Sequence, residues 1–124
     1  MIEILGVGIG GFIGSVLRYL LTKIIPSGFF PFPTLTANIL AGFSIGIVAG
    51  LDNSVFQLPQ KWRLFATTGI FGGLSTFSTF NLETIKLFDS GRYTAAGLNI
   101  IVNISLSLFG FLLGKSIIRA VVPV

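Results

Sequence analysis

The sequence predicts an all-α integral membrane protein with four membrane-spanning helices, of which the third is interrupted. Hydrophobic residues make up 52% of the 124 residues and charged residues only 10%, whereas an average soluble domain carries about 25% charged residues. The apolar residues lie in long runs divided by short connections, and the third run contains glycines and hydroxyl side chains at its centre. Most side chains are therefore expected to face lipid or one another.

The first two spans are expected at about residues 2–25 and 34–51, because a spanning helix needs about 20 predominantly apolar residues. A connection at residues 26–33, which contains three prolines, separates them. The chain enters the first run without a basic leader or a small-residue cleavage site. We therefore expect a retained helix and not a removable signal peptide.

The third and fourth spans are expected at about residues 61–88 and 93–122. A polar, proline-containing connection at residues 52–60 precedes the third span, and a turn with the sequence Asp-Ser-Gly-Arg, at residues 89–92, precedes the fourth. No long linker or soluble segment is left over. Residues 1–124 are thus predicted to form a single four-helix transmembrane domain.

The distribution of basic residues predicts dual topology, since membrane orientation follows the lysine and arginine bias between the two faces. With four spans, each face carries four of the eight basic residues: Lys61, Arg63, Lys115 and Arg119 on one, and Arg18, Lys23, Lys86 and Arg92 on the other. A chain without a bias can insert in both orientations, and the two orientations can pair as an antiparallel homodimer. The alternative is that one orientation prevails through features that this count omits.

The composition argues against an enzyme and against nucleic-acid binding. Cysteine and histidine are absent, which removes thiol nucleophiles, imidazole bases and nearly all transition-metal sites. The four acidic residues are scattered, and the basic residues form no run despite a net charge of +4. We read the basic residues as anchors that flank a lipid bilayer. Arg18, inside the first run, is either such an anchor or a residue that attracts anions at a vestibule.

Polar side chains share faces on two of the apolar helices. Thr34 and Asn38 are four residues apart on the second helix, and Asn99, Asn103 and Ser107 repeat this spacing on the fourth; residues four apart lie on one helix face. Such side chains either bond helices to one another or line a polar path through the membrane. The spacing alone leaves both roles open.

The stretch at residues 72–80, Gly-Gly-Leu-Ser-Thr-Phe-Ser-Thr-Phe, is unlike the interior of a spanning helix. Each glycine weakens a helix by about 1 kcal/mol, and the hydroxyl groups offer competing local hydrogen bonds. We therefore expect a break between Gly72 and Thr76, which would expose carbonyl groups for a cation and N–H groups for an anion. Phe77 and Phe80 share a face beyond the break, where their positive ring edges suit an anion.

This nine-residue stretch resembles the signature of the Fluc fluoride channels, also called CrcB. The resemblance extends over the whole chain, including the Arg-Tyr pair at residues 18–19 and Thr34 with Asn38. It implies a passive, fluoride-selective channel in the cell (inner or plasma) membrane that exports fluoride and so reduces its toxicity. It also implies an antiparallel homodimer with two pores, each formed by both subunits. A structural sodium ion would lie at the dimer centre, on backbone carbonyls at Gly72 and Ser75.

The resemblance also implies roles for individual side chains. Phe77 and Phe80 match the phenylalanines whose ring edges line the fluoride path, and Asn38 matches the asparagine that donates to fluoride. Arg18 matches a basic residue near the vestibule. The polar track along the pore corresponds to Thr34, Ser78, Thr79 and Ser107, with Asn103 beside them where many relatives carry a small hydroxyl residue.

A proton-coupled multidrug exporter is the alternative function. Such exporters are also short, dual-topology, four-helix chains, but they need a carboxylate deep in the membrane to exchange protons for cationic drugs. Glu3 lies near the terminus, and Glu83 lies toward the end of the third span. A non-transporting scaffold, the third possibility, leaves the aligned hydroxyl groups and asparagines unexplained. A fluoride channel is therefore the leading hypothesis.

Overall fold

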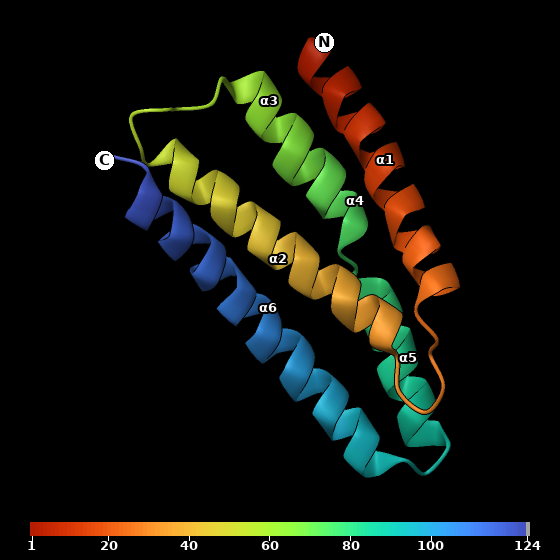
Figure 1. Cartoon of the computed structure of the whole chain (residues 1–124). Helices are drawn as coiled ribbons and strands as arrows, with labels where there is room; N and C mark the ends of the chain where they lie inside the picture. The colour runs from red at the N-terminus through yellow and green to blue at the C-terminus, as the bar shows by residue number, and fades with distance from the viewer. Residues whose placement is uncertain (124) are drawn as a thin grey trace.

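The computed structural model describes residues 1–123, and these residues form helices joined by short connections (Figure 1). The prediction of an all-helical chain is confirmed. The helical segments are α1 (Ile2–Ile24), α2 (Phe32–Asp52), α3 (Gln60–Leu64), the π-helical η1 (Phe65–Phe71), α4 (Gly72–Leu74), α5 (Phe77–Asp89) and α6 (Tyr93–Val121). Three of them, α1, α2 and α6, are long and apolar enough to cross a membrane.

The remaining predicted span, at residues 61–88, is divided into two parts. The segments α3, η1 and α4 follow one another without a gap, and α5 continues in the same general direction after the interruption (Figure 1). Neither part alone reaches the length of about 20 residues that a spanning helix needs. The start of α1, the end of α6 and the connection 53–59 lie at one end of the molecule, and the connections 25–31 and 90–92 lie toward the other (Figure 1).

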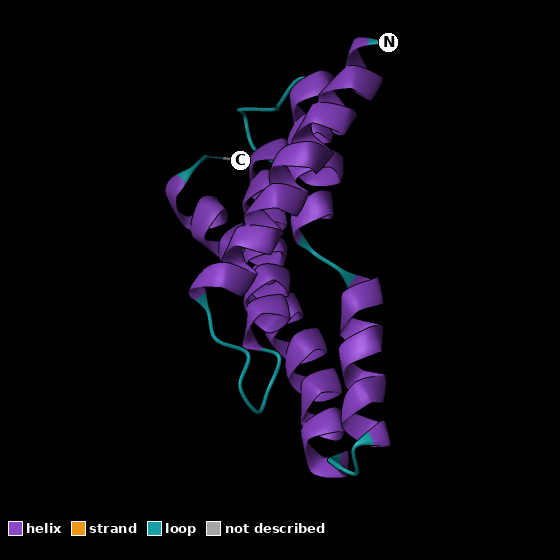
Figure 2. Cartoon of the chain, turned by 90° about the vertical axis from the view of Figure 1, so that its right-hand side faces the viewer, coloured by secondary structure: helices purple, strands orange, loops and turns teal. Residues whose placement is uncertain are grey.

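Two parallel helix pairs form the body of the molecule. Helix α2 packs along α6, and α1 packs along η1 and α4, whereas α5 packs on the first half of α6 (Figures 1 and 2). Glycines allow the close approach in both pairs. Between α2 and α6, a β-carbon added at Gly42 would lie 2.6 Å from the carbonyl oxygen of Ser107. Between α1 and η1, a β-carbon added at Gly10 would lie 2.6 Å from the carbonyl oxygen of Phe65. Small residues let membrane helices approach this closely.

The interruption lies at Ser75 and Thr76, whose backbones are extended, with ψ values of 155° and 122°. Gly72 and Gly73, which we expected to help break the helix, are themselves helical. Gly73 serves close packing instead, because a β-carbon there would lie 2.7 Å from the carbonyl oxygen of Gly11. The hydroxyl of Thr76 accepts the N–H of Thr79 at 3.1 Å and so caps the start of α5.

The buried interior is small, and the outer faces are apolar. Ala37, Ala41 and Leu74 form the central buried cluster, so small side chains fill the space where the helices approach closely. Large apolar side chains are exposed along α1 and α6. Exposed apolar faces of this extent are typical of protein that contacts lipid or another subunit.

Candidate functional site

A groove of about 330 Å³ lies beside the interruption, between α2, α5 and α6. Six of the residues that the sequence singled out line it: Asn38, Ser75, Phe77, Phe80, Asn103 and Ser107. The other lining residues are Ala41, Gly42, Ile45, Thr76 and Ile104, so the groove carries amide, hydroxyl, aromatic and aliphatic groups and no charged side chain.

Asn38 fastens α2 to the interruption. Its Oδ1 accepts the backbone N–H of Thr76 at 2.8 Å, and its Nδ2 donates to the carbonyl oxygen of the same residue at 3.4 Å. Nδ2 also donates to Oδ1 of Asn103 at 2.9 Å. The backbone groups of Thr76 lie outside regular helix, so this side chain supplies the partners that a continuous helix would have supplied.

The two phenylalanines at the start of α5 differ in exposure. The rings of Phe77 and Phe80 lie 5.6 Å apart, centre to centre, with an angle of 37° between their planes. Phe80 is 7% exposed, whereas Phe77 is 74% exposed. Phe80 is therefore held within this chain, and Phe77 presents its ring outward.

Asn103 and Asn99 continue the polar contacts along α6 toward α5. Nδ2 of Asn103 donates to the carbonyl oxygen and to Oδ1 of Asn99, at 2.8 and 2.9 Å. Nδ2 of Asn99 donates to Oγ1 of Thr84 at 2.9 Å, and this hydroxyl donates to the carbonyl oxygen of Phe80 at 2.7 Å. The four-residue spacing placed Asn99 on the polar face, but Thr84 carries no comparable signal and was missed.

Ser107 contributes a hydroxyl group without a partner. Its Oγ is buried and makes no hydrogen bond within residues 1–123, and Ser107 lines the same groove. Buried hydroxyl groups are almost always hydrogen-bonded. A hydroxyl left free beside a polar groove is available to a ligand or to water.

A second pocket, of about 270 Å³, collects three further residues of the predicted set: Arg18, Thr34 and Thr79. Nε of Arg18 donates to the carbonyl oxygen of Gly73 at 3.1 Å, so the guanidinium lies at the end of α4. Thr34 donates to Oε1 of Glu83 at 2.8 Å. The sequence therefore identified residues of two neighbouring pockets and not of a single one.

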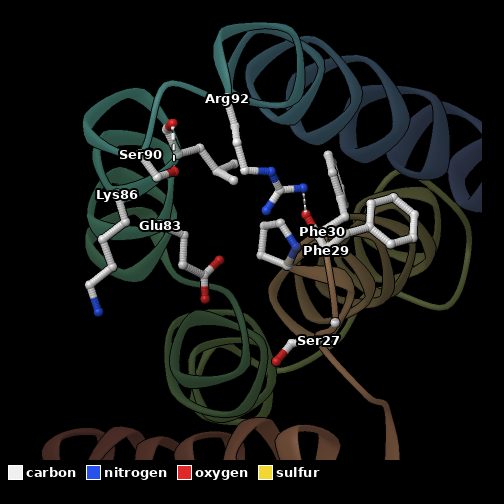
Figure 3. A pocket seen from close by; sticks show the side chains of 10 residues that line it. Ser27, Phe29, Phe30, Glu83, Lys86, Ser90 and Arg92 are labelled. Carbon is white, nitrogen blue, oxygen red and sulfur yellow. Dashed lines mark hydrogen bonds between the residues drawn. The ribbon is translucent and has the colours of Figure 1, made fainter.

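Glu83 also borders a third pocket, of about 260 Å³, between the connection 25–31 and the turn that joins α5 to α6. In Figure 3 its carboxyl group points toward the middle of this pocket, while the ammonium of Lys86 points away. The guanidinium of Arg92 donates to the carbonyl oxygen of Phe29 and ties the two connections together. The sequence reading of Glu83 as a residue near the end of a span did not anticipate its place between two pockets.

Ser78 and Gly72 lie outside these pockets. Ser78 is exposed, and its Oγ lies 3.3 Å from Oγ1 of Thr76. Gly72 is also exposed, and its carbonyl oxygen accepts a long bond, 3.5 Å, from the hydroxyl of Ser75. Because α4 ends at Leu74, its last carbonyl groups lack the usual N–H partners.

The carbonyl oxygen of Gly72, which accepts only the long bond from Ser75, fits a hard monovalent cation such as sodium, since carbonyl groups at half-helix ends coordinate sodium in transport proteins. Among the described residues, no group of three or more histidine, cysteine, aspartate or glutamate side chains is placed to hold a metal ion. The two backbone carbonyls that the sequence assigned to sodium, those of Gly72 and Ser75, are too few to coordinate the ion. Its remaining ligands would have to come from outside these two residues.

Long apolar helices around a polar, uncharged groove define a multi-pass membrane protein. The model of the family described as "CrcB-like protein, Camphor Resistance (CrcB)" matches residues 5–115. The chain belongs to this family. It is 43% identical to a fluoride-specific ion channel FluC of Ruminiclostridium cellulolyticum, over 98% of this chain and 95% of the relative.

Two further relatives, from other organisms, are also named fluoride-specific ion channel FluC. The protein of Thermococcus gammatolerans is 44% identical over 90% of this chain and 94% of its own length. That of Clostridium perfringens is 41% identical over 91% of both chains.

Proposed function

We propose that this protein is a fluoride-selective ion channel that lets fluoride leave the cytoplasm passively. The observation that carries the proposal is the groove beside the interruption, which gathers an amide, hydroxyl groups and two aromatic rings without a charged side chain. The names of the relatives, which cover almost the whole chain, support the same function.

The groove suits a small anion that must lose water. Amide and hydroxyl hydrogens replace water as hydrogen-bond donors, and aromatic ring edges carry partial positive charge. Asn38 has one hydrogen engaged by Asn103 at 2.9 Å and the other in a long, 3.4 Å bond. The second hydrogen is the one that an anion would take over. The absence of a fixed charge in the groove lets the anion leave as readily as it enters.

We also propose that the chain crosses the membrane four times, with residues 60–89 as the divided span, and that it works as an antiparallel homodimer of two insertion orientations. The outward ring of Phe77, 74% exposed, supports a partner subunit at this face. With Phe77 reaching the partner, each dimer would contain two pores, each lined by both chains. The membrane would be the cell (inner or plasma) membrane.

Sodium at the dimer centre belongs to the same proposal. The backbone carbonyls of Gly72 and Ser75 would hold it together with the same two groups of the partner, and the bound ion would add positive potential beside the anion path. The carbonyl end of α4 supports this assignment, because only one long hydrogen bond, from Ser75, reaches the Gly72 oxygen among the described residues.

Ion release from liposomes tests the function. Purified protein is reconstituted, and the release of fluoride and of chloride is measured with ion-selective electrodes. Rapid fluoride release without measurable chloride release is expected. Equal release of both halides, or none from well-folded protein, would refute the proposal. Uptake of a cationic dye driven by a proton gradient would favour the multidrug exporter instead.

Two substitutions test the groove in the same assay. Asn38→Leu and Phe80→Leu should slow fluoride release, because the first removes the donor and the second the ring edge. Phe12→Leu, on the exposed face of α1, is the matched control and should conduct normally. Unchanged release in both groove variants would exclude the groove as the path.

A further inference from the structure

The polar contacts around the groove form one continuous chain of five hydrogen bonds, which we call the relay. It starts at a backbone N–H in the interruption, crosses to α2, passes along α6 and returns to a backbone carbonyl in the first turn of α5. Every bond in it measures 2.7–2.9 Å. Its members, in order, are Thr76, Asn38, Asn103, Asn99, Thr84 and Phe80.

The two ends of the relay fix the orientation of every amide within it. The N–H of Thr76 can only donate, and the carbonyl group of Phe80 can only accept. Asn38 must therefore turn its oxygen toward Thr76, and each following amide must present its oxygen to the preceding donor. A reversed amide anywhere in the relay would set two donors or two acceptors against each other and leave buried groups unpaired.

This orientation decides what Asn38 offers to the groove. With its oxygen held by Thr76 and one hydrogen held by Asn103, its remaining hydrogen makes only the 3.4 Å bond to the carbonyl oxygen of Thr76. That hydrogen is a donor; a reversed amide would present an acceptor, which an anion avoids. The relay also begins and ends on residues 76–80, the segment that carries Phe77 and Phe80.

Asn99 and Thr84 take part in the relay without lining the groove. Asn99 is 1% exposed, the most completely enclosed of the large side chains in the described part of the chain, and Thr84 is buried. Neither side chain can touch an ion in the groove, so any effect that they have on conduction passes through Asn38 and the first turn of α5.

We propose that Asn99 and Thr84 are positioning residues of the channel, a proposal that rests on the function proposed above. They keep the amide hydrogen of Asn38 directed at the anion path and hold Phe80 in place. Loss of the Thr84 hydroxyl leaves the Asn99 amide without its acceptor, so Asn99 holds Asn103, and through it Asn38, less firmly. The rate of fluoride passage then falls although the fold is retained.

Four variants test the proposal in liposomes with few channels per vesicle, where the fraction of active vesicles and the release rate of each active vesicle are measured separately. Thr84→Val keeps the side-chain shape and removes the hydroxyl, and Asn99→Leu removes the amide. Thr84→Ser restores the hydroxyl. Thr67→Val is the matched control, because Thr67 makes the same hydroxyl-to-carbonyl bond, to Arg63 at 2.8 Å, outside the relay.

Thr84→Val and Asn99→Leu should slow release by about tenfold, in line with the loss of one hydrogen bond, and should leave the active fraction unchanged. Thr84→Ser and Thr67→Val should release fluoride at the wild-type rate. A purely structural role would lower the active fraction and not the rate, and that result would overturn the proposal, as would wild-type rates in both slowed variants.

A wild-type protein that releases no fluoride would refute the proposed function and not the relay. Hydrogen exchange at the N–H of Thr76 then decides. Faster exchange in Thr84→Val than in Thr67→Val would support the relay, since the far end of the chain of hydrogen bonds has been removed. Equal exchange in both variants would overturn it.

Discussion

The hydroxyl of Thr34 donates to Oε1 of Glu83 over 2.8 Å, which joins the first turn of α2 to the middle of α5. The second carboxyl oxygen, Oε2, is buried and has no hydrogen-bond partner among residues 1–123. A buried carboxyl oxygen without a hydrogen-bond donor costs free energy. The Thr34 hydroxyl supplies a donor to Glu83, so we expect this contact to help hold α5 against α2.

Replacing Thr34 should therefore destabilise the protein. Thr34→Val keeps the shape and removes the donor, and it should lower the free energy of unfolding by about 1–3 kcal/mol. Thr34→Ser should restore most of that loss. Denaturant unfolding in detergent measures the effect, with Thr36→Val on the same helix as the control. Equal stability of Thr34→Val and wild type would show that the contact contributes nothing.

Ser107 is expected to separate function from stability. Its hydroxyl is buried but unpartnered, so Ser107→Ala removes no hydrogen bond from the fold. Thermal unfolding should be unchanged, while fluoride release from liposomes should slow, because a donor in the groove is lost. Ser105→Ala, on an exposed part of the same helix, is the control. Normal release in Ser107→Ala would remove this residue from the anion path.

The contact between α2 and α6 should tolerate no side chain at Gly46, because an added β-carbon would overlap the carbonyl oxygen of Phe111. Gly46→Ala should lower the free energy of unfolding by about 1–3 kcal/mol, the usual cost of overpacking. Gly97→Ala is the matched control: nothing lies within 4 Å of a β-carbon there, and alanine favours helix. Equal stability of the two variants would contradict this packing.

Dual topology is tested by labelling single cysteines, which the natural chain lacks. Gln57 and Asp89 are exposed, and they belong to the connection 53–59 and to the end of α5, which lie at opposite ends of the molecule (Figure 1). In intact cells, Gln57→Cys and Asp89→Cys should each react with an impermeant thiol reagent to about half of their total, because the two orientations are equally populated in an antiparallel dimer. Labelling of one position only would show a single orientation.

Hydrophobic run lengths and helix-breaking residues were enough to predict the helices. The long helices end within about two residues of the expected limits, because prolines and glycines at their ends leave few alternatives. The interruption was also predicted, but its position was not resolved: the glycine pair stays helical, and the break falls at Ser75 and Thr76. The sequence does not show that Gly73 packs closely against Gly11, as it does within helical α4. This contact could not have been used to place the break after the glycines and not at them.

The sequence predicted which residues line the candidate site, but it did not predict that they divide between two pockets. Six of the expected residues meet in one groove, whereas Arg18, Thr34 and Thr79 lie in a neighbouring pocket. Periodicity identifies which side chains share a helix face, but it does not say how far along the axis a facing helix sits. The role of Thr84 depends on the antiparallel register of α5 and α6, which only the structure supplies.

The interruption also breaks the continuous helical register between the two parts of the divided span. The part before Ser75 packs on α1 and the part after Thr76 packs on α6. A residue inserted in a continuous helix rotates everything beyond it by about 100°. Here the extended pair interrupts that continuity, so the face that α5 turns toward α6 is not set by the helical register of α3 and η1.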